Sequence, residues 1–162
     1  MDADEGLYHA KPQTRGKVAH TTVDEKTGNK RRGDLFSLPV YSARYNLMGK
    51  IDVYREKEKL LIERKYQLKQ IYQGQIYQLW AQYFCLTEMG YVVERLAFYE
   101  ISTNRMYPVA LPTAKDTEQF TTFVQGFHSF NPYDFVSLNS NKCRHCIYCN
   151  LCDKTEEENV YQ

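Results

Sequence analysis

The sequence predicts an α/β or α+β sandwich, because its strands are flanked by helices on both sides. Three observations support this fold class. Apolar residues alternate through the stretch from about 38 to 66, which is typical of strands. A broad apolar stripe at helical spacing lies between Gly74 and Gly90. A second pair of strands and a further helix follow. The predicted order is helix, three strands, helix, two strands, helix.

The first elements are predicted as follows. A short helix from about 13 to 24 carries Val18 and Val23 inward. The segment 25 to 34 is rich in glycine and basic residues, so we expect a polar loop. Strands follow at 38 to 46, 48 to 55 and 59 to 66.

The charged link at 56 to 59 is short, so the last two strands of this group form a hairpin. The long helix then begins near Gly74 and ends at Gly90, which is well placed to cap it. Strands at 92 to 101 and 105 to 111 precede a helix at 114 to 128. The apolar face of the long helix between Gly74 and Gly90 consists of Ile76, Leu79, Trp80, Tyr83, Phe84 and Leu86.

The bulk properties describe one folded domain over residues 1–162, with a core at about 10–130 and a Cys-rich region at 141–153. The net charge is +1, so any nucleic-acid site must be a local patch. The sequence shows neither a long apolar span nor a signal peptide, and we expect a reducing, cytoplasmic compartment.

The central motif is Asp52 followed, after a gap of hairpin length, by Glu63 and Lys65 on an apolar strand. Residues two apart in a strand share a face, so Glu63 and Lys65 point the same way. If the register brings Asp52 beside Glu63, two carboxylates and an ammonium converge. Carboxylates of this kind hold Mg²⁺ or Mn²⁺ for phosphodiester hydrolysis. Lys65 can orient water or offset charge in the transition state.

Gln78 and His20 could support this motif. Gln78, on the following helix, could bind a phosphate or the attacking water. Gln82 lies one turn on, and a plain polar stripe on a half-buried helix explains it equally well. His20 follows Gly16 by four residues, which by itself is a weak signal. Without these neighbours, Glu63 and Lys65 would read as ordinary charges on a solvent face.

The C-terminal tail carries Cys143, Cys146, Cys149 and Cys152, each three residues from the next. Four thiolates at this spacing predict a metal-organised turn, because soft ligands select zinc or an iron–sulfur centre. His145 is a further candidate ligand. Cys85 lies inside the apolar helix and is predicted to be a buried core residue.

Single-stranded DNA would be held by a local basic patch with aromatic residues. The candidates are Lys17, Lys50 and Lys69 near the carboxylates, the loop residues Lys30, Arg31 and Arg32, and Tyr66 and Tyr72 for base stacking. The alternative, that the charges of this loop are solvated and do not bind DNA, carries equal weight.

Taken together, the motifs resemble the RecB-like exonuclease family of CRISPR adaptation, the Cas-four nucleases, and most closely those of type V systems. The resemblance extends from about Tyr8 to Cys152. It is carried by Gly16 to His20, Gly49-Lys50-Ile51-Asp52, Leu61-Ile62-Glu63-Arg64-Lys65-Tyr66, Gln78-Leu79-Trp80-Ala81 and Lys142-Cys143-Arg144-His145-Cys146-Ile147-Tyr148 through Cys152.

The resemblance implies a PD-(D/E)xK core of the restriction-endonuclease type. It implies that His20, Asp52 and Glu63 bind Mg²⁺ or Mn²⁺, that Lys65 is the catalytic lysine and that Gln78 is the motif glutamine. It also implies a [4Fe–4S] cluster on Cys143, Cys146 and Cys152. The activity would be exonuclease trimming of DNA ends before the CRISPR integrase inserts a spacer, a step of antiviral defence.

This chain departs from the family pattern at three points. The family carries a first cluster cysteine in an N-terminal segment that this chain does not contain, so we expect a shortened N-terminus or an incomplete cluster. Cys149 is an additional thiolate that could replace it. Gln82 stands where a tyrosine is common. Two alternatives therefore stay open: a Cys-rich zinc module that binds DNA without cutting it, or an inactive remnant of a nuclease.

Overall fold

The computed structural model describes residues 33–135, 137–146, 148 and 151–152 of the 162-residue chain. The chain divides into two compact units, and residues 33–128 belong to one of them. The described residues from Ser129 onward belong to the other. The predicted helix at 13 to 24 lies outside the described residues.

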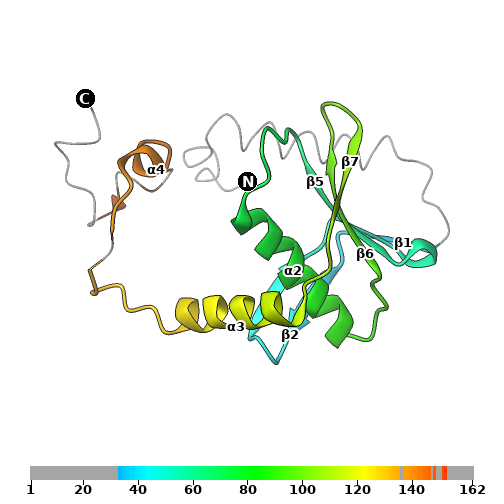
Figure 1. Ribbon diagram of the computed structural model, residues 1–162, viewed down its shortest axis with the longest axis horizontal. Coiled ribbons are helices and arrows are strands. Elements are labelled where there is room, and N and C mark those ends of the chain that lie inside the picture. Colours follow the sequence, from blue (N-terminus) through cyan, green and yellow to red (C-terminus); the bar gives the residue numbers. More distant parts are fainter. Residues whose placement is uncertain (1–32, 136, 147, 149–150, 153–162) are drawn as a thin grey trace, which may run out of the picture. The chain divides into compact units, whose positions relative to one another are not determined.

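A five-stranded mixed sheet forms the centre of the first unit (Figure 1). Its strands, in spatial order, are β1 (Asp34–Phe36), β4 (Val53–Arg55), β5 (Leu60–Lys65), β6 (Arg95–Glu100) and β7 (Arg105–Val109). A short 3₁₀ turn, η1 (Glu56–Glu58), joins β4 to β5, as the predicted hairpin requires. Only β5 and β6 are parallel, while the other neighbours are antiparallel.

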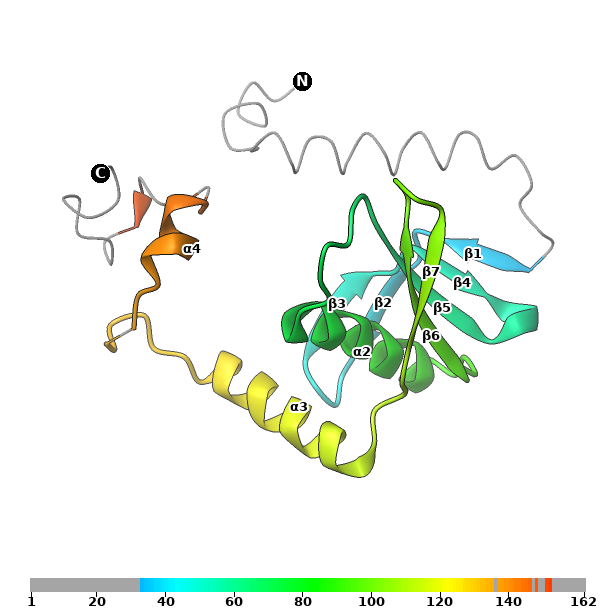
Figure 2. The same cartoon turned by 45° about the horizontal axis from the view of Figure 1, so that its top comes forward.

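Helix α2 (Gln73–Glu88) makes the crossover that a parallel strand pair needs, and it packs against one face of the sheet (Figures 1 and 2). Leu79 and Leu86 of the helix share one buried cluster with Leu61 and Phe98 of the sheet. A smaller cluster around Ile62 covers the other face. Side chains alternate along β5, so odd-numbered residues of this strand face α2.

The predicted long helix is thus confirmed, and so is the role of Gly90 at its end. Gly90 follows the cap residue Met89 and has φ of +95°, a left-handed conformation that glycine adopts without a steric penalty. The Gly90 N–H donates to the carbonyl of Thr87, which satisfies one of the last helical oxygens.

The prediction of strands at 38 to 46 and 48 to 55 is wrong in its boundaries. The structure instead has β2 (Pro39–Ser42) and β3 (Leu47–Lys50), which form a separate two-stranded sheet next to α2 (Figure 2). Residues 43–46 turn between them, and Asn46 has φ of +50°.

Glu88, at the end of α2, fixes this turn between β2 and β3. Its carboxylate accepts hydrogen bonds from the Ser42 hydroxyl and from the backbone N–H of Ala43 at 2.8 Å. These bonds hold the pKa of Glu88 below its usual value, the Ser42 bond contributing most.

The chain changes sheets at Ile51 and Asp52, which is why the expected strand is divided. The N–H of Ile51 donates to Leu38 O at 3.0 Å, and the N–H of Ser37 donates to Asp52 O at 3.1 Å. These backbone bonds replace the ladder of a continuous strand. β1 was also not expected, since its residues lie at the end of the predicted polar loop.

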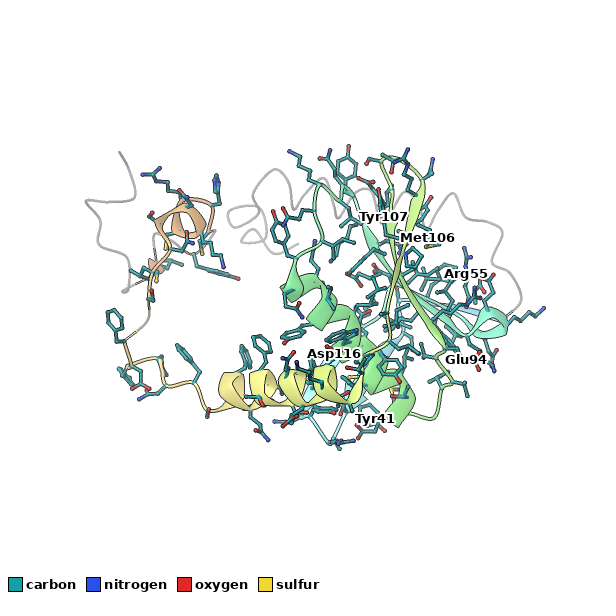
Figure 3. All side chains as sticks on the ribbon, viewed as in Figure 1. Tyr41, Arg55, Glu94, Met106, Tyr107 and Asp116 are labelled. Carbon is teal, nitrogen blue, oxygen red and sulfur yellow. The ribbon has the colours of Figure 1, made fainter. Side chains whose placement is uncertain are left out.

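Helix α3 (Ala114–His128) has the bounds that the sequence predicts. Thr113 and Asp116, the latter labelled in Figure 3, cap its start reciprocally, because each backbone N–H donates to the other side chain. The Thr113 hydroxyl also holds the pKa of Asp116 below its usual value. Phe120 is buried and packs edge-on against Tyr77 of α2, with ring centroids 5.6 Å apart.

In the second unit, α4 (Ser140–Arg144) is a short helix capped by Asn139, whose side chain accepts from the N–H of Lys142. A plain metal-organised turn was predicted here, so the helical turn at Cys143 is a difference. Among the residues that the structure describes, no helix is long and apolar enough to cross a bilayer.

Candidate functional site

The strand pair β4–β5 brings Asp52 and Glu63 to the same end of the sheet. Val53 pairs with Ile62, so one further step of the antiparallel register sets Asp52 opposite Glu63. Asp52 Oδ2 accepts a hydrogen bond of 2.8 Å from the backbone N–H of Arg64. This bond anchors the Asp52 carboxylate to the strand that carries Glu63, directly after the point where the chain changes sheets.

Glu63 is the central residue of this group, and only 6% of its surface is exposed. It lies on the α2 side of β5, and three donors surround its carboxylate. Lys65 Nζ and Gln78 Nε2 donate to Oε1 at 2.8 Å and 2.7 Å. Gln82 Nε2 donates to Oε2 at 2.8 Å. A carboxylate with this many donors is held in one orientation.

Lys65 and Gln78 also contact each other, and this closes a ring with Glu63. Lys65 Nζ donates to Gln78 Oε1 at 2.9 Å. The side chain of Lys65 is partly accessible, at 23% of its full exposure, and Gln78 is exposed. The ring therefore reaches from a buried carboxylate to the surface, where a substrate can meet it. We name Asp52, Glu63, Lys65 and Gln78 the carboxylate cluster.

Gln82 belongs beside this cluster, although the sequence left its role open. It is 7% exposed and lies one helical turn after Gln78, so both amides meet Glu63 from the same face of α2. Its Oε1 is buried and has no hydrogen-bond partner among the residues that the structure describes. Spacing at i, i+4 along a helix that packs on the Glu63 strand was the available sequence signal.

The cluster offers oxygen ligands of the type that Mg²⁺ and Mn²⁺ prefer. Within the described part of the chain, no group of three or more His, Cys, Asp or Glu side chains is close enough to hold a metal ion. His20, the third predicted ligand, lies outside the described residues. Two carboxylates and the neighbouring amides are therefore the described donors.

Glu100 is a second buried carboxylate, and the sequence analysis did not single it out. It pairs with Lys65 in the parallel register and is 4% exposed. Its oxygens accept from Thr103 Oγ1 at 2.6 Å, Leu68 N at 2.8 Å and Tyr107 Oη at 3.0 Å. Tyr107 is labelled on β7 in Figure 3. These bonds, that of Thr103 first, lower the pKa of Glu100 to about 2.

An apolar groove of about 280 Å³ adjoins Gln78. Tyr77, Gln78 and Ala81 of α2 line it on one side, and aromatic residues of α3 line it on the other. Phe123 and Phe127 are more than half exposed. The groove thus places flat apolar surfaces next to the polar cluster.

The other predicted contact residues are distributed as follows. Lys50, Lys69, Tyr66 and Tyr72 are exposed in the first unit. Lys17, Lys30, Arg31 and Arg32 lie outside the described residues. Cys85 is buried as predicted, and burial raises the pKa of its thiol to about 11.

The cysteines of the tail lie in the second unit. Cys143 is in α4 and is partly exposed, while Cys146 and Cys152 are exposed. The N–H of Cys146 donates to Cys143 O at 3.0 Å, so these two residues share one turn. His145 follows α4 as its cap residue and is exposed. Cys149 lies outside the described residues.

Comparison with known proteins finds a similarity in three-dimensional structure. No protein-family model matches the chain. No curated protein matches it either. Among solved structures, the crystal structure of SSO0001 is similar, with a TM-score of 0.59 over 90% of this chain and 72% of that one. The two sequences are 13% identical, so the likeness shows a shared α/β fold and nothing about chemistry.

Proposed function

We propose that this protein is a divalent-metal-dependent DNA nuclease with a PD-(D/E)xK core. One observation carries the proposal: Asp52 accepts from the backbone N–H of Arg64, the residue next to Glu63, and Lys65 and Gln78 bond directly to Glu63. Two carboxylates, an ammonium and an amide on one side of a sheet form the set that phosphodiester hydrolysis requires. A protein that only binds DNA needs no buried acid in contact with a lysine.

The described residues fit a bound Mg²⁺ or Mn²⁺. Asp52 and Glu63 would hold the ion, and His20 would join them as the family resemblance implies. The Gln82 amide, which bonds Glu63, carries a further buried oxygen that has no partner within the described part of the chain. When bound, the ion supplies a water molecule of lowered pKa and draws charge from the scissile phosphate.

Lys65 and Gln78 have roles that follow from their contacts. Lys65 Nζ is the accessible cation of the cluster, so it would neutralise charge on the phosphate or orient the attacking water. Gln78 bonds both Glu63 and Lys65, and therefore fixes the distance between acid and ammonium. Such positioning contributes to the rate because no reorganisation is needed during the reaction.

The substrate we propose is a single-stranded DNA end. Lys50, Lys69 and Tyr66 are exposed in the same unit as the carboxylate cluster and could contact phosphates and bases. The resemblance to the Cas-four nucleases supports exonuclease trimming before spacer integration, with the CRISPR integrase as partner. Co-purification with the integrase from the same locus tests that partner, and its absence at micromolar concentration would count against a stable complex.

The decisive experiment compares two Glu→Gln variants on end-labelled single-stranded DNA, with Mn²⁺ or with EDTA. Glu63→Gln should abolish cleavage. Glu94→Gln is the matched control, because Glu94, labelled in Figure 3, is exposed and its carboxylate accepts from the surface Lys59. If Glu63→Gln still cuts at the wild-type rate, the assignment is wrong. If the wild type binds DNA but never cuts it, the binding-module alternative holds.

The Cys-rich tail is proposed to hold a [4Fe–4S] cluster on Cys143, Cys146 and Cys152, with Cys149 as the fourth ligand. Their soft thiolates and regular spacing support a metal centre. Elemental analysis after anaerobic purification distinguishes the two metals. About four irons per chain and a brown colour are expected. One zinc per chain and no iron would instead show a tetrahedral zinc site.

A further inference from the structure

Gln78 and Gln82 bond the same carboxylate but are held very differently. Gln78 is fixed at both ends, because its Nε2 donates to Glu63 and its Oε1 accepts from Lys65. Turning this amide over would break both bonds. Gln82 is fixed at one end: its Nε2 donates to Glu63 Oε2, while its buried Oε1 meets no donor from the described residues.

This difference makes the orientation of the Gln82 amide depend on Glu63 alone. When the amide turns over, Nε2 takes the place of Oε1, and an unpartnered atom occupies that position in either case. The two orientations therefore differ in what they present to Glu63, and in whether a carbonyl oxygen or an N–H₂ group stays unpaired. A bare carboxylate favours the N–H donor. A cation on the carboxylate repels the N–H and favours the carbonyl oxygen, which is a suitable ligand for hard cations.

We propose that Gln82 is an additional cation ligand, whose amide turns over when a divalent cation binds Glu63 and whose Oε1 then coordinates the ion. This inference rests on the proposed metal site and deepens it. It gives the Gln82 oxygen a partner when the cation is bound. It also supplies a third oxygen beside Asp52 and Glu63 from the described part of the chain.

The test is Mn²⁺ binding by calorimetry on the full chain without DNA. Gln82→Met keeps the length of the side chain and removes both amide atoms. A ligand role predicts that Mn²⁺ binding weakens about tenfold. A mere donor role predicts the opposite sign, since a bound ion would no longer compete with the Gln82 bond to Glu63. Gln125→Met, at an exposed position of α3, is the control and should leave binding unchanged.

A second measurement uses the unaltered protein, in case Gln82→Met does not fold. The side-chain amide protons of Gln82 should shift in an NMR titration with Mg²⁺, because neither proton then bonds Glu63. The amide of Gln78 should keep its orientation. Unchanged Gln82 signals, or unchanged or tighter Mn²⁺ binding by Gln82→Met, would overturn the proposal.

The failure of this inference can be separated from failure of the metal site. Glu63→Gln should remove Mn²⁺ binding. If it does so while Gln82→Met binds as the wild type does, the site stands and Gln82 is not a ligand. If the wild type binds no Mn²⁺, the metal site and the Gln82 ligand are both excluded.

Discussion

Glu63 and Glu100 are both buried carboxylates on the same face of neighbouring strands, yet their surroundings differ in kind. Glu63 is bonded by three side chains, one of them the partly accessible Lys65. Glu100 is bonded by a backbone N–H and by hydroxyls from the turn after β6 and from β7. The first set can be displaced by a ligand without moving the backbone, whereas the second set holds loops in place.

The comparison shows that burial alone does not identify a chemical site. Glu100 is as buried as Glu63, and its hydrogen bonds lower its pKa to about 2. Its donors nevertheless satisfy it within the fold, and none of the described cations forms an ion pair with it. The feature that favours Glu63 is a partly accessible ammonium and two side-chain amides that bond its carboxylate. The predictions below separate these two roles.

The largest expected effect is the loss of cleavage in Glu63→Gln. Removing the charge should reduce the rate at least about a hundredfold, because the cation loses an anionic ligand. Thermal stability should change little, since Gln can still accept from Lys65. Glu100→Gln should behave in the opposite way, with lower stability and nearly normal cleavage at low temperature. Cleavage lost equally in both variants would contradict the division of roles.

Lys65→Met should reduce the rate about tenfold to a hundredfold, as expected for the loss of one charged transition-state contact. Mn²⁺ binding should persist or strengthen, because the ammonium no longer competes for Glu63 Oε1. Steady-state kinetics with calorimetry on the same preparation gives both values. A variant that loses Mn²⁺ binding would indicate that Lys65 acts through folding.

The next effect in size is the contribution of Glu100 to the pH dependence of stability. Its pKa is lowered from 4.5 to about 2 in the folded protein. A carboxyl group whose pKa is lower in the folded than in the unfolded protein stabilises the fold fully at a pH above the unfolded-state pKa. This stabilisation is lost as the pH falls through the folded-state pKa. The wild type should therefore lose its advantage over Glu100→Gln between about pH 4.5 and pH 2. Denaturant titrations across that range measure it, and a constant difference would contradict the assignment.

Gly90→Ala provides the smallest effect and a control for general destabilisation. The left-handed φ of +95° should cost an alanine about 1 kcal/mol of unfolding free energy. The N–H of Gly90 bonds Thr87 and not the carboxylate cluster, so cleavage well below the melting temperature should be unchanged. Circular dichroism melts together with the nuclease assay test this. A large fall in activity would mean that small changes in α2 stability disturb the Glu63 contacts.

The spacing of apolar residues along the sequence was sufficient to predict the elements whose burial pattern is regular. β5 is buried along nearly its whole length, and α2 and α3 each bury an apolar face, so their positions follow from local residues. The proximity of Asp52 and Glu63 followed from hairpin length. The division of the strand near Ile51 did not, because it depends on backbone bonds to Ser37 and Leu38 that only the tertiary fold brings close.

The polar partners of the site were harder to predict for the same reason. Gln82 contacts an acid 19 residues earlier, and Glu100 accepts from Leu68, 32 residues earlier. A polar residue on a mostly apolar face looks the same in sequence whether it faces solvent or a buried carboxylate. The distinction needs the register of β5 and β6 and the rotation of α2.

The crossover helix has a consequence for how the protein is made. β5 leaves the ribosome before α2, and β6 follows α2, so β5 has no parallel neighbour until residues 95–100 have been synthesised. Parallel pairing requires closure of this whole loop, which is slow compared with forming the β4–β5 hairpin. A nascent chain thus carries Glu63 on a half-finished sheet. The nuclease centre that we propose would form late in synthesis, at the same step that completes the fold.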